Sequence, residues 1–347
     1  MTERRLYLDH GEGESRGVVS LGGKPERLLI TREGDIAEQA LGAQVIARVR
    51  SVQRSQALAF LDLGEGPDAV LNLLPDMPRL VEGASVEVEI RTQARAGKGA
   101  SARLIGPAEG PPRLVMPGPS VEEQLRGFAR DAQIQTGPVA RSMADGAQDE
   151  CLETIYGLPG GGSLAIEPTR ALVAVDVDLG AGVGADAKRA SRVANFAAIN
   201  TAARVLRLKG LGGLVVIDLV GRGHDGPALL SAARAAFGPD NPGVAIGPVS
   251  RFGTLELTVP RRARPALDIL TDGANGPSDL TQALALVRGL EREATADGGG
   301  RFVGVATLEI IQLATPILAG LIARLGARLS LRADPDRAGG AAEVARL

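Results

Sequence analysis

The stretch ALVAVDVDLGAG at residues 171–182 decides the fold, together with a second stretch, GGLVVIDLVG, at residues 212–221. Each is a short aliphatic and β-branched run, typical of a strand inside a core, and each ends in aspartate. A buried carboxylate is costly unless it is paired, hydrogen-bonded or bound to a metal. Residues two apart on a strand share a face, so Asp176 and Asp178 can serve one site. Asp218 joins them if the two strands are neighbours.

Taken alone, an aspartate at the end of a strand is more often a turn residue or a helix cap than a metal ligand.

The length of the chain, 347 residues, predicts two or more domains. With 44% hydrophobic and 23% charged residues, the chain is expected to be globular. Aromatic residues make up 2% and tryptophan is absent, so any stacking on nucleic acid rests on very few side chains.

The charge distribution is uneven, although the net charge is only −2. Residues 168–264 carry 13 Lys and Arg against 7 Asp and Glu, a local net charge of +6. A basic surface around a small acidic cluster suits a polyanionic substrate and a divalent cation. An ordinary solvated surface is the alternative.

Cysteine and histidine are too scarce for a zinc site. Cys151 is the one cysteine, which excludes an intrachain disulfide, and His10 and His224 lie far apart in sequence. The N-terminus has no apolar signal-peptide core, and the apolar tract 302–325 is interrupted by polar residues, proline and glycine, which favours a strand followed by a helix. We therefore expect a cytoplasmic protein that contacts no membrane.

The pattern of hydrophobic residues changes along the chain. Short strands with glycine-rich turns are expected over 4–35, and five strands over 37–105 suit a small OB-type barrel. A helix is expected over 121–132, and longer strand–helix–strand units, the α/β signature, begin at 151. The last unit is predicted as helix 280–296, strand 301–306, helix 307–325 and strand 327–332.

Three blocks in order resemble the catalytic core of the ribonuclease E/G family: LPGGGSLAIEPTRALVAVDVD at 158–178, LRLKGLGGLVVIDLV at 206–220 and PVSRFGTLELT at 248–258. The resemblance implies a multidomain protein of α/β and α+β type. Its expected parts are an RNase H-like subdomain (1–36 and 106–150), interrupted by an S1-type OB-fold RNA-binding barrel (37–105), a DNase I-like catalytic α/β subdomain (151–260), a linker (261–279) and a small C-terminal α/β domain (280–347).

The resemblance also implies roles for individual residues. Asp176 and Asp218 match the family's two magnesium-binding aspartates, and Asp178 stands where the family usually has an asparagine that orients the first, so all three are expected to be catalytic.

Three further residues match family positions that bind RNA. Phe60 matches a barrel aromatic, Lys98 a barrel lysine, and Arg251 the arginine of SRFG. The alternatives are that Phe60 is a core residue, that Lys98 simply faces water, and that Arg251 caps a strand.

The implied activity is a magnesium-dependent endoribonuclease, with Mn²⁺ as the alternative ion. It would cleave single-stranded RNA with a metal-activated water and leave 5′-phosphate products, in RNA processing and decay. The rival hypothesis is an RNA-binding or scaffold paralogue with weak or no catalysis. A phosphodiesterase acting on DNA is a third class, which the S1-type barrel disfavours.

Several departures from the family favour the scaffold hypothesis. A second barrel aromatic is replaced by Val70, and a second acidic residue after VID is replaced by Gly221. The segment after the barrel is too short for a full sensor of 5′-monophosphates. The zinc-linking cysteines are absent, their place taken by residues 268–275, so we expect no zinc, and a homodimer, if formed, held by other surfaces.

Overall fold

The structure is a computed structural model that describes residues 3–95, 98–180, 187–238, 242–273, 276–335, 337 and 342–347. Its central sheet consists of β1 (Arg4–Gly11), β2 (Glu14–Leu21), β3 (Lys24–Arg32) and the short β10 (Ile134–Gln135), which pairs in parallel with β1. A helix packs on each face of this sheet: α1 (Val121–Phe128) on one and α2 (Pro138–Leu152) on the other. Side chains that alternate along β1 and β2 therefore fill two separate cores.

Residues 44–107 form a closed five-stranded barrel. Its strands are β4 (Gln44–Gln53), β5 (Leu58–Asp62), β6 (Ala69–Asn72), β7 (Ser85–Thr92) and β8 (Ser101–Pro107), and pairing of β5 with β4 closes it. The barrel is consistent with the OB fold expected from the sequence. An additional strand, β9 (Arg113–Met116), pairs with β4, and short 3₁₀ turns η1 (Ala37–Gln39) and η2 (Arg54–Gln56) flank β4.

The third unit is a six-stranded sheet covered by two helices. Its strands, in the order β11-β12-β13-β14-β16-β15, are β11 (Ile155–Gly157), β12 (Ser163–Pro168), β13 (Val173–Asp178), β14 (Gly213–Asp218), β16 (Thr254–Val259) and β15 (Ala245–Val249). The helices are α3 (Ala187–Lys209) and α4 (Gly226–Phe237), and their apolar residues share one core with the strands.

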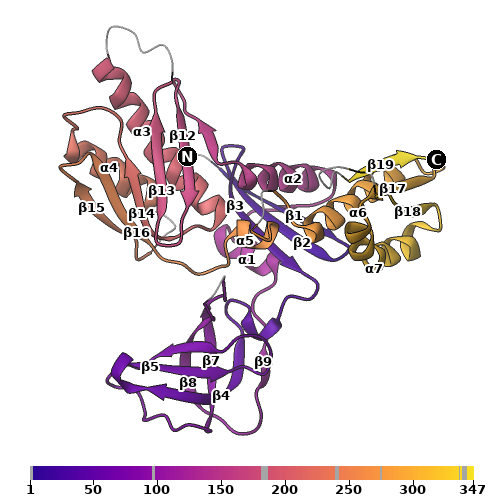
Figure 1. Ribbon diagram of the computed structural model, residues 1–347, viewed down its shortest axis with the longest axis horizontal. Helices are drawn as coiled ribbons and strands as arrows, with labels where there is room; N and C mark the ends of the chain where they lie inside the picture. The colour runs from indigo at the N-terminus through magenta and orange to yellow at the C-terminus, as the bar shows by residue number, and fades with distance from the viewer. Residues whose placement is uncertain are drawn as a thin grey trace.

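The C-terminal unit is a three-stranded sheet packed against two helices. β17 (Phe302–Ala306) lies between β18 (Leu329–Ala333) and β19 (Glu343–Arg346), with α6 (Asp279–Ala296) and α7 (Leu308–Leu325) beside it. In the described residues, α7 is the one helix long and apolar enough to cross a membrane by length and composition, and 22% of it is buried. Figure 1 shows the central sheet between this unit and the six-stranded sheet, with the barrel below.

Buried ion pairs join the central sheet to the C-terminal unit. The carboxylate of Glu14 on β2 accepts from Arg32 Nε at 2.8 Å and from Arg288 Nη1 of α6 at 2.7 Å, and its side chain is 2% exposed. Arg141 of α2 contacts Glu291 of α6 at 2.7 Å. Burial is the main cause that lowers the pKa of Arg288 to about 10. These pairs fix the C-terminal unit against the rest of the chain.

The strands and helices expected from the sequence are present, with several differences. The expected helix 121–132 ends at Phe128, because residues 129–133 turn to bring β10 beside β1. The sequence did not predict helix α2 or the short strands β9, β10, β11 and β19, and a short helix, α5 (Ala266–Leu270), lies in the segment expected to be a linker.

Candidate active site

Asp176 and Asp218 end up side by side because β13 and β14 are parallel neighbours. Their register pairs Val175 with Ile217 and Asp176 with Asp218. Parallel strands lie about 4.8 Å apart, so two carboxylates at matching positions on one face are within reach of a shared ligand. The sequence predicts that the two strands that end in aspartate are neighbours, and the observed register agrees with this prediction.

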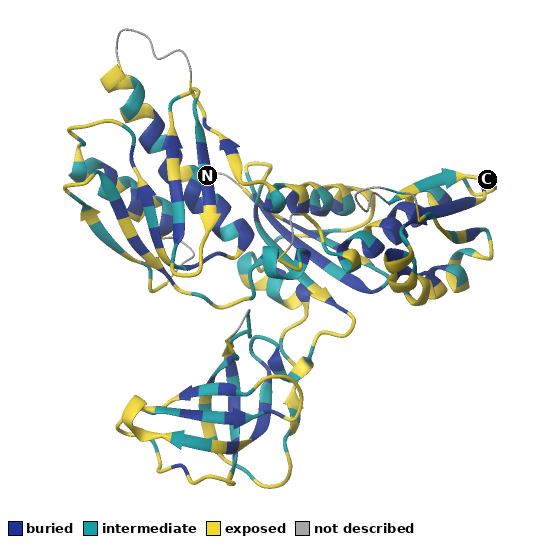
Figure 2. Ribbon diagram, viewed as in Figure 1, coloured by how far each residue is buried: buried dark blue, intermediate teal, exposed yellow. Residues whose placement is uncertain are grey.

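The two aspartates lie on the open face of the six-stranded sheet. In β13 and β14 the alternate residues Val175, Val177 and Ile217 are buried in the core shared with α3, whereas the aspartates are exposed. Figure 2 shows this alternation along the strands. The carboxylates thus avoid the cost of burial and face solvent, where a substrate can reach them.

Asp178 also points to the open face but makes a local contact. Its Oδ1 accepts a hydrogen bond from the backbone N–H of Gly180 at 3.0 Å, and it pairs across the sheet with Ser163. Gly162, at φ +84°, lies so close that a Cβ there would be 2.3 Å from the carbonyl oxygen of Asp178. The sequence LPGGG thus includes a glycine that the end of β13 requires.

No group of three or more His, Cys, Asp or Glu residues in the described ranges is gathered closely enough to hold a metal ion. The described residues therefore bring together a pair of carboxylates, Asp176 and Asp218, and Asp178 lies further along β13. Residues 181–186, which include Gly182 and Gly184, lie outside the described residues.

Asn195 of α3 holds the end of β14 and was not singled out from the sequence. Its Nδ2 donates to the carbonyl oxygen of Val220 and its Oδ1 accepts from the Val220 N–H, both at 3.0 Å. Asn195 is 2% exposed. A lone amide on the apolar face of a long helix was the available signal, since a buried amide needs partners.

Gly221 follows at φ +94°, where a Cβ would lie 2.9 Å from Ser191 Oγ of α3. This backbone conformation, together with the close approach of α3, explains why glycine stands there. A side chain at this position would be strained in this backbone conformation.

The turn that joins β15 to β16 contains Arg251 and lies at the same sheet edge as Asp218. Thr254, the first residue of β16, pairs with Asp218, and the N–H of Leu219 donates to the carbonyl oxygen of Gly253 at 3.2 Å. Arg251 is exposed, with its guanidinium carbon 4.7 Å from the centre of the Phe252 ring. The turn therefore brings a cation to the edge where the two aspartates meet.

Glu256 adds another carboxylate to the open face. It is exposed, it pairs with Val216, and its Oε1 accepts from Thr254 Oγ1 at 3.1 Å. The alternation in TLELT could have indicated that its side chain shares a face with the aspartates.

The comparisons with known proteins match the same region. Residues 124–262 match the model of the Ribonuclease E/G family. A stretch of 113 residues is 37% identical to Ribonuclease E of Haemophilus influenzae and a stretch of 113 residues is 36% identical to that of Escherichia coli, each 32% of this chain. The chloroplastic Ribonuclease E/G-like protein of Arabidopsis thaliana is 32% identical over 139 residues, 39% of this chain.

The family match covers a part of the chain, residues 124–262, that includes the whole six-stranded sheet. The matched stretches span only 12%, 11% and 14% of those three relatives, respectively. The barrel is followed closely by α1, since β8 ends at Pro107 and α1 begins at Val121, with β9 between them.

Phe60 lies on the outer surface of the barrel. Its neighbours in β5, Ala59 and Leu61, are buried in the barrel core, whereas Phe60 is half-buried. Across the sheet it pairs with Val70 and with Ser51. The alternative that Phe60 is a core residue does not agree with this placement.

Lys98 is exposed and forms an isolated bridge with Arg95, around two residues that lie outside the described ranges. The barrel and the six-stranded sheet occupy separate places in Figure 1. The structure therefore brings Asp176, Asp218 and the turn of Arg251 together, whereas Phe60 and Lys98 belong to the barrel.

The barrel is nevertheless attached to the segment that follows β16. The N–H of Gln93 donates to the carbonyl oxygen of Arg262 at 2.9 Å, and its side-chain oxygen accepts from the N–H of Arg264 at 2.9 Å. This places the end of β7 against the basic segment 261–264 that follows the six-stranded sheet.

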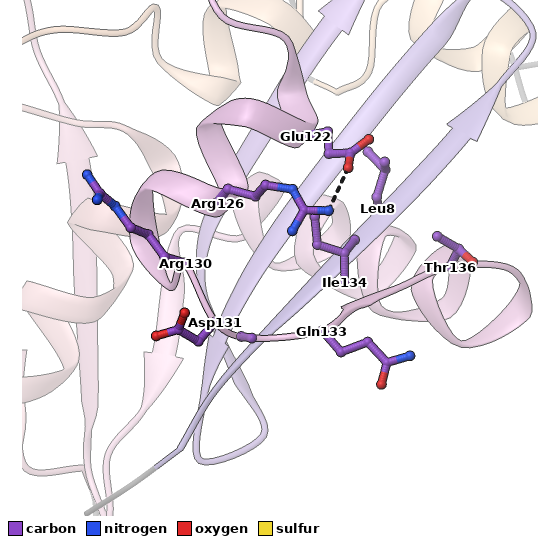
Figure 3. A pocket seen from close by; sticks show the side chains of 9 residues that line it. Leu8, Glu122, Arg126, Arg130, Asp131, Gln133, Ile134 and Thr136 are labelled. Carbon is purple, nitrogen blue, oxygen red and sulfur yellow. Dashed lines mark hydrogen bonds and ion pairs between the residues drawn. The ribbon is translucent and has the colours of Figure 1, made fainter.

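A cavity of about 440 Å³ lies beside α1 and β10, away from the aspartates (Figure 3). It is lined by Leu8 and by eight residues between Glu122 and Thr136, and Arg126 among them is paired with Glu122 at 2.9 Å. None of the predicted site residues lines this cavity, so the candidate active site is an exposed sheet edge instead.

Proposed function

We propose that the protein is a magnesium-dependent endoribonuclease that cleaves single-stranded RNA. The observation that carries the proposal is the direct pairing of Asp176 with Asp218 on the open face of the sheet, within the region that matches the ribonuclease E/G family. A basic surrounding segment favours a polyanionic substrate over a neutral one.

The two aspartates fit a magnesium site in number and chemistry. Mg²⁺ is usually bound by one or two carboxylates and takes its other ligands from water and substrate phosphate. Exposed carboxylates on an open face leave room for both. Mn²⁺ prefers the same oxygen ligands and is the alternative ion. When bound, the ion supplies positive charge beside the scissile phosphate and makes water more acidic.

The residues of the chain would then position the substrate and the carboxylates. Asn195 fixes the end of β14 just beyond Asp218. Asp178 ties the end of β13 to its own following turn through Gly180. Arg251 is exposed at the same edge, where a guanidinium can contact a phosphate of the RNA backbone.

The barrel would provide a second contact with RNA. Phe60 presents an aromatic surface on the outside of the barrel, and Lys98 presents a charge. Aromatic stacking of bases next to basic side chains is the common mode of single-strand recognition. The expected products carry 5′-phosphate and 3′-hydroxyl ends.

The experiment is cleavage of an end-labelled AU-rich single-stranded RNA in Mg²⁺ by the wild type, Asp176→Asn and Asp218→Asn. Each substitution removes one negative charge without changing the side-chain volume much. We expect both variants to lose cleavage at least a hundredfold. Glu167→Gln is the matched control, because Glu167 is an exposed acid on the same face of neighbouring β12. Undiminished cleavage by both aspartate variants would contradict the proposal.

A second candidate function, an RNA-binding scaffold with little catalysis, is favoured by Val70. It pairs with Phe60, where an aliphatic side chain cannot stack on a base. Calorimetric titration with Mg²⁺ separates the two functions. Binding by the wild type that both aspartate variants lose supports the nuclease, whereas RNA binding without any Mg²⁺ binding supports the scaffold.

A further inference from the structure

Phe252 is an exposed aromatic residue in a chain that has few aromatic residues. The chain contains two tyrosines and six phenylalanines, all within the described ranges. Phe252 is 77% exposed, whereas the other seven are buried or half-buried. A phenylalanine that faces water gains nothing from burial, so its exposure needs another reason.

The turn that carries Phe252 is held by several hydrogen bonds. The N–H of Phe252 donates to Ser250 Oγ at 3.2 Å, the N–H of Gly253 donates to the Ser250 carbonyl at 3.1 Å, and Ser250 N–H donates to the Thr254 carbonyl at 2.8 Å. Gly253 has φ +88°, a conformation that favours glycine. Phe252 therefore sits at a defined position and not on a loose loop.

That position is next to the paired aspartates. Gly253 accepts a hydrogen bond from Leu219, the residue after Asp218, and Thr254 pairs with Asp218 itself. Phe252 thus projects from the sheet edge at which the proposed metal ligands end. A nucleotide whose phosphate lay at those carboxylates would have its base within reach of this turn.

Arg251 completes the arrangement. Its guanidinium carbon lies 4.7 Å from the centre of the Phe252 ring, a cation–π contact that leaves the other ring face available. An exposed aromatic face beside an arginine is the combination that binds single-stranded nucleic acid, because the ring stacks on a base and the cation contacts the backbone.

We propose that Phe252 stacks on a base of the RNA next to the cleaved phosphate and so helps to select unpaired substrate. A base in a duplex already stacks on its neighbours, so only an unpaired base can occupy the ring face. This proposal rests on the proposed function, and it assigns to the SRFG turn a contact with the base in addition to the phosphate contact of Arg251.

Fluorescence gives a direct test, because the chain contains no tryptophan. Phe252→Trp in an Asp218→Asn background introduces one reporter in a protein that should not degrade the probe. The probes are a short single-stranded oligouridylate and an abasic oligomer of the same length. We expect the oligouridylate to quench the fluorescence in parallel with binding measured by anisotropy, and the abasic oligomer to leave it unquenched.

Two outcomes of the fluorescence test would overturn the stacking proposal. One is oligouridylate binding, seen by anisotropy, with no change in fluorescence. The other is the absence of any binding of oligouridylate.

Kinetics of variants at this position provide the second test, in proteins that keep Asp218. Phe252→Ala and Phe252→Leu should raise the KM for single-stranded RNA about 5- to 100-fold, the loss of one stacked base, and Phe252→Tyr should match the wild type. Because the residue is exposed, none of these variants should lose its fold, which circular dichroism checks.

The outcomes distinguish this proposal from the proposed function. A wild type that cleaves RNA, with a Phe252→Ala variant of equal KM, overturns the stacking role and leaves the nuclease intact. A wild type that cleaves no RNA contradicts the nuclease, while the fluorescence result still decides whether Phe252 meets a base. A change of mass in light scattering without a change in RNA affinity would make Phe252 a protein contact, against the proposal.

Discussion

Replacement of Asn195 by alanine tests whether the end of β14 depends on a single buried amide. The side chain makes two hydrogen bonds, each 3.0 Å long, to the backbone N–H and carbonyl of Val220. Alanine removes both and leaves the two backbone groups of a half-buried residue without partners. Each lost bond costs about 1–2 kcal/mol in such a place, so we expect the free energy of unfolding to fall by about 2–4 kcal/mol.

The control is Asn200→Ala in the same helix. Asn200 is exposed and its side chain donates only to the carbonyl oxygen of Phe196, one turn earlier. Its loss should change the free energy of unfolding by less than about 0.5 kcal/mol. Urea unfolding followed by circular dichroism gives both values, since the linear dependence on denaturant extrapolates to water.

Local and functional measurements sharpen the test. In Asn195→Ala the amide hydrogen of Val220 should exchange faster with solvent, because its acceptor is gone, and the Leu219 amide should follow to a smaller extent. Asp218 lies two residues away, so the loss of its support should lower kcat by roughly 10- to 100-fold. Unchanged stability together with unchanged exchange at Val220 would refute the reasoning.

The remaining predictions concern other parts of the chain. Gly221→Asp should destabilise the protein by about 1–3 kcal/mol, measured by thermal unfolding, because φ is +94° there and a Cβ meets Ser191. Burial raises the pKa of the Cys151 thiol to about 12, so it should react with a disulfide reagent at pH 8 only after denaturation. Its contribution to stability should also fall above about pH 9, where the unfolded thiol ionises and the folded thiol does not. Val70→Phe should tighten binding of single-stranded RNA about fivefold or more by anisotropy, because it places a second ring beside Phe60.

Much of the fold follows from local pattern, whereas the missed elements depend on distant contacts. The runs that became β13 and β14 are short apolar stretches that end in aspartate, and both are strands in the structure that end at Asp178 and Asp218. Helix α2 is rich in alanine, and Gly146 interrupts its pattern. It forms because Ala140 and Ala144 pack on the central sheet. Strand β19 is four residues long and exists only as a partner of β17.

The same distinction applies to the site. The sequence alone predicts that Asp176 and Asp218 lie close together, because each ends an apolar strand. Their direct pairing follows if those two strands are parallel neighbours. Asn195 and Phe252 could not be assigned in this way. The role of Asn195 depends on its contact with the Val220 carbonyl, which only the packing of α3 against β14 creates. The role of Phe252 depends on the exposure of its turn.

The core, and not the carboxylates, keeps the two aspartates aligned. Val175 and Ile217 pair in the same register as Asp176 and Asp218, and both are buried against α3. A slip of β14 by one residue would turn Ile217 to the open face and Asp218 into the core, at a cost of apolar burial and a buried charge together. Repulsion between two exposed carboxylates is smaller than that cost, because water screens it. The apolar residues of the two strands can therefore hold like charges together at the position where a cation or a phosphate with its cation would bind.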